Sequence, residues 1–248
     1  MDTLLHPTIA LLQSHSLASA AQQAIEQAIL SGEYPQGAKL NEAALAEKLG
    51  VSRGPIREAF RMLDEAGLIR SEKNRGVFVR DISVIDAIEI FDLRAAMEEW
   101  VGRQLATQIT PAQLHEINTL LQAMTQAVAD QRVDDYHQLN LQFHDRLVEM
   151  TGNRRLLALY RKLIKELSLF RRLNLAGAGA LPLSGQGHRQ IVDAISSGDA
   201  AAAGRAMAEH VRGSKQRTLH NQQPRPVAGD QPGPMPMTAT AEVPSESQ

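Results

Sequence analysis

The chain has 248 residues, of which 43 % are hydrophobic and 22 % charged, a balance that indicates a folded protein with room for one large or two ordinary domains. It contains no cysteine, which excludes disulfides and thiolate metal sites, and no apolar run approaches the roughly 20 residues that span a bilayer. The net charge of −2 does not by itself indicate a nucleic-acid partner, and the N-terminus lacks a secretory signal, so we expect a cytoplasmic protein.

The N-terminal region is predicted to contain one supporting helix. Residues 1–15 show no clear pattern and are expected to form a flexible arm. From Leu17 to Leu30, apolar residues recur at helical spacing, and Ser16 is placed to cap that helix. Gly32 and Pro35 end it, because both residues interrupt a helix.

The stretch 40–80 is predicted to form a helix, a tight turn, a second helix and a small two-stranded wing. The first helix is expected over 42–49 and ends at Gly50, since glycine tolerates the left-handed conformation found at helix ends. Ser52 is placed to cap the second helix, and Pro55 falls in its first turn, where no helical N–H is lost. An apolar stripe on this helix recurs at i, i+3, i+4 and i+7: Ile56, Ala59, Phe60 and Leu63.

A row of arginines lies on a different face of the second helix. The wing strands are expected over 68–70 and 77–79, with basic residues near the tip between them. A helix-turn-helix places such arginines against guanine edges and phosphates, and a glycine lets the backbone approach the minor groove. The predicted DNA contacts are Ser52, Arg53, Arg57, Arg61, Arg75 and Gly76. The other interpretation is a solvated charged helix, but the turn, cap, stripe, arginine row and wing occur in order.

This stretch also resembles a known family. The run LAEKLGVSRGPIREAFRMLDEAGLI, closed by NRGVFV, is similar to the winged helix-turn-helix of GntR-type bacterial transcription regulators, and the resemblance covers residues 16–80. It implies double-stranded DNA as a partner. One helix-turn-helix reads only a few base pairs, so we expect a homodimer on a palindromic operator.

The second half of the chain is predicted to be an all-α bundle, which makes the whole fold mainly α. After a short connection at 81–83, six helices are expected over 84–106, 110–130, 134–150, 153–173, 184–196 and 199–219, with a loop over 174–185. No strand is indicated after the wing, so residues 83–220 form one helical domain. Residues 221–248 hold six of the eleven prolines and are expected to be a disordered tail.

Three of the eight histidines, His144, His188 and His210, lie on apolar helical stripes. Asn140 lies one turn before His144 on the same helix face. A single such histidine is usually a hydrogen-bonded core residue. Three on separate helices, all facing inward, indicate one divalent metal held by these four side chains, with zinc, nickel and manganese all open. Since the imidazoles must be neutral, occupancy is expected to fall below about pH 6.

Residues 83–218 resemble the FCD ligand-binding domain of the FadR subfamily of GntR regulators. That domain typically has an Asp four residues before a Phe-His pair, then a Gly/Glu-His followed by Ile, then a late His; the matches here are NLQFH, GHRQI and MAEHV. Asn140 departs from the usual Asp. Because an amide oxygen is the weaker ligand, metal affinity is lower here or depends on an anionic effector.

The same resemblance assigns an effector role to Arg94 and Asn140. Arg94 matches an arginine on the first helix of the domain, and the other interpretation is an internal ion pair with Glu98 four residues later. We expect a regulator, in particular a repressor, whose operator binding is altered by a small organic acid at the metal. A sensor of the metal itself and a histidine-ligated metalloenzyme are the alternatives. Neither His188 nor His210 is followed by an acidic residue as in HExxH-type motifs, so we do not expect an enzyme.

Overall fold

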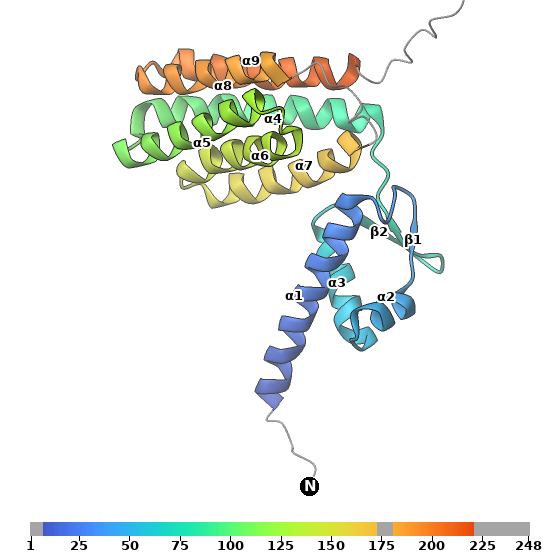
Figure 1. Ribbon diagram of the computed structural model, residues 1–248. Coiled ribbons are helices and arrows are strands. Elements are labelled where there is room, and N and C mark those ends of the chain that lie inside the picture. Colours follow the sequence, from blue (N-terminus) through green and yellow to red (C-terminus); the bar gives the residue numbers. More distant parts are fainter. Residues whose placement is uncertain (1–6, 173–180, 221–248) are drawn as a thin grey trace, which may run out of the picture.

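The computed structural model describes residues 7–172 and 181–220, which form a small N-terminal domain and a larger helical bundle (Figure 1). The fold is mainly α, with an N-terminal winged helix-turn-helix and a C-terminal all-α bundle, as predicted. Within these two ranges, every helix is too short or too polar to cross a membrane.

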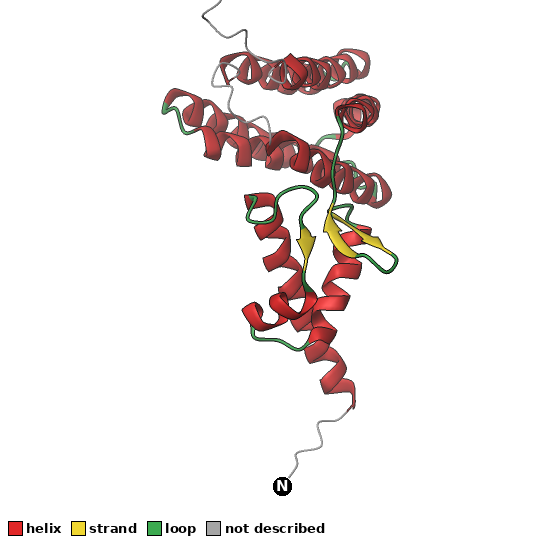
Figure 2. Cartoon of the chain, turned by 90° about the vertical axis from the view of Figure 1, so that its right-hand side faces the viewer, coloured by secondary structure: helices red, strands yellow, loops and turns green. Residues whose placement is uncertain are grey.

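The N-terminal domain comprises three helices and a three-stranded antiparallel sheet (Figure 2). Its elements in chain order are α1 (Pro7–Ser31), β1 (Lys39–Leu40), α2 (Glu42–Leu49), α3 (Arg53–Glu65), β2 (Ile69–Glu72) and β3 (Gly76–Val79). The strand order is β1-β3-β2. The sequence predicted the two wing strands but not β1, which at two residues is too short to show a periodicity.

Local residue chemistry explains the helix-turn-helix. Asn41 caps α2, because its side-chain oxygen accepts hydrogen bonds from the backbone N–H groups of Ala43 (2.9 Å) and Ala44 (3.1 Å). Gly50 ends α2 with a φ of 65°, as expected. The predicted stripe of α3 is buried, and α1 packs against it.

The helix α1 begins at Pro7, so the prediction of a flexible arm over 1–15 is wrong for residues 7–15. Proline is favoured at the first helical position, and alanine and leucine in this stretch are strong helix formers. Residues 1–6 lie outside the described residues.

The bundle contains six helices within the described residues. They are α4 (Val84–Gln108), α5 (Pro111–Ala129), α6 (Val133–Met150), α7 (Arg154–Arg172), α8 (Leu181–Ser196) and α9 (Ala200–His220). The predicted caps Ser83, Thr110 and Asp199 are confirmed by side-chain hydrogen bonds to the first turns of α4, α5 and α9. Helix α9 lies along α4 (Figure 1), and the ion pair between Lys215 and Asp92 places the last turns of α9 beside the first half of α4.

Two segments towards the C-terminus were predicted to lack helical structure, a loop over 174–185 and a tail over 221–248. The loop predicted over 174–185 is wrong for residues 181–185, because α8 already begins at Leu181. The first turn of that helix contains Pro182, which loses no helical hydrogen bond there. Residues 173–180 and the tail predicted over 221–248 lie outside the described residues.

Helix α7 contributes to two hydrophobic cores. Tyr160 packs in the bundle core with residues of α4, α5, α6, α8 and α9. Further along the same helix, Leu163, Leu167 and Phe170 pack in a core that also contains residues of α1, α3 and the sheet. The two domains are therefore joined by apolar packing as well as by the short connection at 81–83.

Candidate functional site

The first candidate site is the exposed face of α3. Ser52 occupies the predicted N-cap position of α3 with extended backbone. Its side chain makes no capping hydrogen bond, so the predicted position is confirmed but the capping interaction is not formed. Its hydroxyl is not engaged by the helix. Arg53, Arg57 and Arg61 are all exposed, in line with the predicted row. The Nε of Arg57 is 3.0 Å from a carboxylate oxygen of Glu42 on α2.

The wing carries more positive charge than the sequence predicted. Arg75 pairs with Glu72, and Gly76 has a φ of 115°. Phe78 on β3 is flanked by its cross-strand neighbours Lys39 and Arg70. Lys39 Nζ and the guanidinium carbons of Arg70 and Arg75 lie 5.8, 5.6 and 5.9 Å from the ring centroid. Only the strand register reveals Lys39 and Arg70 as members of this basic tip.

The second candidate site lies inside the bundle, where the three predicted histidines meet. His144 on α6, His188 on α8 and His210 on α9 each direct a ring nitrogen to a common point, with these nitrogens within 4.8 Å of one another. The Nε2 atoms of His144 and His188 are 3.2 Å apart. Two imidazoles on one zinc at about 2.0–2.1 Å have nitrogens roughly 3.3 Å apart in tetrahedral geometry. The nitrogen spacing thus fits a shared divalent cation.

Asn140 lies half-buried one helical turn before His144, as predicted. Its side-chain amide takes part in none of the hydrogen bonds found among the described residues. Its role as a ligand stays a prediction.

Glu98 on α4 is a member of the histidine site that the sequence did not indicate as such. Its side chain is fully buried, and its Oε2 lies 2.8 Å from Nδ1 of His144, although the contact is not aligned as a hydrogen bond. Its other oxygen, Oε1, accepts hydrogen bonds from Arg94 (2.6 and 3.1 Å) and from the hydroxyl of Tyr160 (3.2 Å). Burial would raise the pKa of Glu98, but the neighbouring His144 and the guanidinium of Arg94 outweigh it and hold that pKa well below its usual value.

Arg94 is buried in the ion pair with Glu98 that the sequence left as its alternative role. Its Nε and Nη2 atoms contact Glu98, whereas Nη1 takes no part in the hydrogen bonds of the described residues. The pKa of Arg94 is raised, since the attraction of Tyr160 and Glu98 outweighs the opposing effect of burial. Its effector role stays a prediction.

The third histidine, His210, packs closely against Gly187. Burial lowers the pKa of His210 to about 3, and the neighbouring His144 acts in the same direction, so the His210 imidazole is neutral at physiological pH. A Cβ added at Gly187 would lie 2.6 Å from Nδ1 of His210. Only glycine at this position leaves room for the ring.

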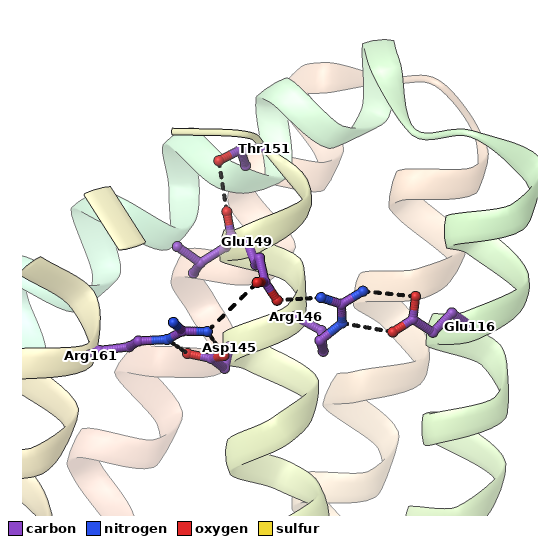
Figure 3. A network of polar contacts seen from close by, with 7 residues as sticks. Glu116, Asp145, Arg146, Glu149, Thr151 and Arg161 are labelled. Atoms are coloured by element: carbon purple, nitrogen blue, oxygen red, sulfur yellow. Dashed lines mark hydrogen bonds and ion pairs between the residues drawn. The ribbon is translucent and has the colours of Figure 1, made fainter. Parts of the chain in front are cut away.

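An ionic network on the outer side of α6 fixes the helix that carries His144 (Figure 3). Arg146 donates to both carboxylate oxygens of Glu116 on α5 at 2.7 and 3.0 Å. Arg161 on α7 donates to both oxygens of Asp145 at 2.8 and 2.6 Å. Two bidentate pairs thus hold α6 between α5 and α7.

A cavity of about 650 Å³ lies apart from the histidines, between α1 and the α6–α7 pair. Its lining is mainly amide and charged side chains: Gln22, Gln23, Glu26, Gln27, Leu30, Ser31, Gln138 and Lys165. The ion pair between Glu26 and Lys165 spans it from one domain to the other.

Both regions match known family models. The model described as bacterial regulatory proteins, gntR family, matches residues 17–79, and the FCD domain model matches residues 89–213. The chain is 32 % identical over 210 residues to a probable D-xylose utilization operon transcriptional repressor of Paenarthrobacter nicotinovorans, covering 83 % of this chain and 90 % of the relative. It is 28 % identical over 176 residues to the HTH-type transcriptional repressor RspR of Escherichia coli, covering 71 % and 77 %.

Solved structures share the fold. A structure described as a GntR regulator from Rhodococcus aligns with a TM-score of 0.69 at 25 % identity, covering 83 % of this chain and 98 % of the other. The structure of McbR/YncC from E. coli aligns with a TM-score of 0.71 at 18 % identity, covering 82 % and 97 %.

Proposed function

Since this chain belongs to the GntR family of bacterial regulatory proteins and carries an FCD domain, we propose that it is a repressor whose operator binding is controlled by a divalent metal and a small organic acid. Its family and relatives are DNA-binding transcriptional regulators, which rules out the metalloenzyme considered from the sequence. We propose that it acts in the bacterial cytoplasm. Two relatives named as repressors support repression here.

The proposed DNA contacts come from α3 and the wing. Arg53 and Arg57 reach base edges in the major groove, Ser52 and Arg61 lie nearer the phosphates, and the wing tip at Arg75 and Gly76 approaches the minor groove. The support is that all six predicted residues lie on the surface of one small domain or at its wing. A homodimer would present two such faces to a palindromic operator.

The proposed metal ligands are His144, His188 and His210, with Asn140 or water beside them. The observation that carries this proposal is the convergence of the three ring nitrogens, in particular the 3.2 Å between the two Nε2 atoms. Imidazole nitrogens suit zinc, nickel and manganese in different degrees, and the donor set does not choose among them. The low pKa of His210 supports a neutral ring that can act as a ligand.

The proposed effector is an anion because of the charge balance of the site. The positive charge of Arg94 is matched by Glu98, and neutral imidazoles add none. A bound divalent cation would supply an uncompensated double charge and open coordination positions. A small organic acid fits best, with one carboxylate directed to the histidines and another oxygen to Nη1 of Arg94; a phosphonate or other oxyanion is the second choice.

The test is a titration of small organic acids against the protein–operator complex, with zinc, nickel or manganese added to metal-free protein. We expect an active acid to release the wild type from DNA in the presence of metal, but not His188→Ala. The matched control is His115→Ala, an exposed histidine on α5 that should respond as the wild type. If the acid acts equally in His188→Ala, the metal is not part of effector binding. If metal alone changes DNA affinity, the protein is the metal-responsive regulator considered as the alternative.

A further inference from the structure

We propose that Glu98 is the positioning residue of the histidine site, and that it sets which nitrogen of His144 is offered to the metal. This proposal rests on the proposed metal function. The contact behind it involves only residues of this chain: the buried carboxylate of Glu98 on α4 lies beside Nδ1 of His144 on α6.

A neutral imidazole has one N–H donor and one acceptor nitrogen, and a partner at one nitrogen decides the role of the other. Glu98 Oε2 lies 2.8 Å from Nδ1 of His144, and neither buried atom has a hydrogen-bond partner among the described residues, so each is the nearest polar group open to the other. An ionised carboxylate only accepts hydrogen bonds, so it favours a proton on Nδ1. The lone pair is then on Nε2, the nitrogen that faces His188.

Glu98 is itself held by groups from two further positions. Its Oε1 receives hydrogen bonds from Arg94, one turn earlier on α4, and from the hydroxyl of Tyr160 on α7. These donors leave Oε2 as the oxygen directed to His144. Carboxylates that accept from a metal-bound histidine orient the ring and raise the basicity of its ligand nitrogen.

The other two histidines have different surroundings at Nδ1. The Nδ1 of His188 lies 3.5 Å from the hydroxyl of Tyr136, at the limit of a hydrogen bond. The Nδ1 of His210 faces Gly187. The carboxylate beside Nδ1 of His144 is the charged group from which we argue the ring orientation.

Glu98→Gln gives a specific expectation. Arg94 and Tyr160 still present donors, so the amide oxygen of Gln faces them and the amide NH₂ faces Nδ1 of His144. That arrangement requires a lone pair on Nδ1 and moves the proton to Nε2, which blocks the metal. We expect about 10–100-fold weaker binding of Co²⁺, followed by visible absorption on adding the ion to metal-free protein.

The matched control is Tyr160→Phe, which removes one donor to Oε1 and leaves the contact with His144 unchanged. We expect it to bind Co²⁺ nearly as the wild type does, whatever its change in thermal stability. A loss of Co²⁺ affinity in both variants that follows their loss of stability would overturn the positioning role, since a merely structural contact predicts that result.

A second measurement does not depend on a variant that folds. Nitrogen-15 NMR of imidazole-labelled, metal-free wild type, with the His144 signals assigned from His144→Gln, reports the proton on Nδ1. Finding the lone pair at Nδ1 would sink the proposal. If the wild type carries the proton on Nδ1 but binds no Co²⁺, the metal function fails while the role of Glu98 in setting the tautomer stands.

Discussion

The arginines of α3 and the wing lie among acidic side chains in the absence of DNA. Arg57 contacts Glu42, and Arg61 contacts Glu58 and Glu65 on its own helix. Exposed ion pairs of this kind contribute about 0–1 kcal/mol, so a DNA phosphate or base can replace the carboxylate at small cost. These acids hold the guanidinium groups near the surface that they would present to DNA.

Arg57→Ala is expected to weaken operator binding by about 1–3 kcal/mol and to relax sequence preference, because a bidentate base contact is lost. Fluorescence anisotropy with the operator and with a scrambled duplex measures both effects. Arg103→Ala is the matched control, since Arg103 is an exposed, ion-paired arginine on α4 in the other domain. Equal operator affinity of Arg57→Ala and wild type would remove this residue from the interface.

Gly187→Ala tests the packing of the third histidine. The added methyl group would lie 2.6 Å from Nδ1 of His210, so the imidazole must shift from the position in which it meets the other two rings. We expect Co²⁺ affinity to fall at least tenfold, although alanine is favoured over glycine in a helix interior by roughly 0.5–1 kcal/mol. Gly213→Ala on α9 is the control, where the nearest atom belongs to the flexible Arg217 and metal affinity should persist. Wild-type affinity in Gly187→Ala would place His210 outside the ligand set.

At the scale of single residues, helical periodicity was enough to predict the three histidines, because each falls on an apolar stripe of its own helix. The same rule did not indicate the role of Glu98. Its partner His144 is 46 positions away on another helix, and its i+4 relation to Arg94 is also that of an ordinary ion pair. Contacts between helices depend on the packing of the bundle, which a pattern along one helix does not contain.

Helix α7 connects the histidine site to the DNA-binding domain. Tyr160 contacts Glu98 at one end, and Lys165 and Glu166 lie about 9 Å further along the axis. Lys165 pairs with Glu26 of α1 at 2.8 Å, and Glu166 pairs with Arg80, just after β3, at 3.2 Å. A shift of α7 at the histidines therefore acts directly on α1 and on the strand end.

Glu166→Gln is expected to weaken this connection. The change in operator affinity on adding metal and an active acid should shrink toward zero, from a coupling that is typically 1–3 kcal/mol. Co²⁺ binding should stay as in the wild type, because Glu166 does not contact the histidines. Lys162→Gln is the control, an exposed residue on the same helix with no ion pair among the described residues. A full response to the acid in Glu166→Gln would exclude the Glu166–Arg80 pair as part of this connection.

At the scale of elements, the helices of both domains follow from their caps and apolar stripes, as Ser83 and Thr110 illustrate. The strand β1 and the first turns of α1 and α8 were missed. Two residues cannot show a strand periodicity, and Lys39–Leu40 becomes a strand only by pairing with β3. The helix starts were missed because the apolar face of a first turn is incomplete, so these residues show no clear helical periodicity.

At the scale of the whole molecule, one face of α4 carries exposed apolar side chains that the described residues leave uncovered. Ile85, Leu93 and Trp100 are 68 %, 55 % and 39 % exposed. At 100° per residue, the three positions fall within about 80° of one another around the helix, on the side away from the buried Arg94 and Glu98. A two-fold axis beside this face would bury the same residues from two copies and would place two DNA-binding domains side by side.

Leu93→Asp tests whether this face joins two copies. A carboxylate buried in a symmetric contact would meet its own copy, so we expect the variant to be a monomer by sedimentation at micromolar concentration, where we expect the wild type to be a dimer. The variant should also lose the preference of the wild type for a palindromic operator over a single half-site, because each monomer engages one half-site alone. Leu159→Asp on α7, 51 % exposed in the chain, is the matched control and should remain dimeric. A dimeric mass for Leu93→Asp would move the interface to another surface, whereas a monomeric wild type with and without DNA would contradict the homodimer itself.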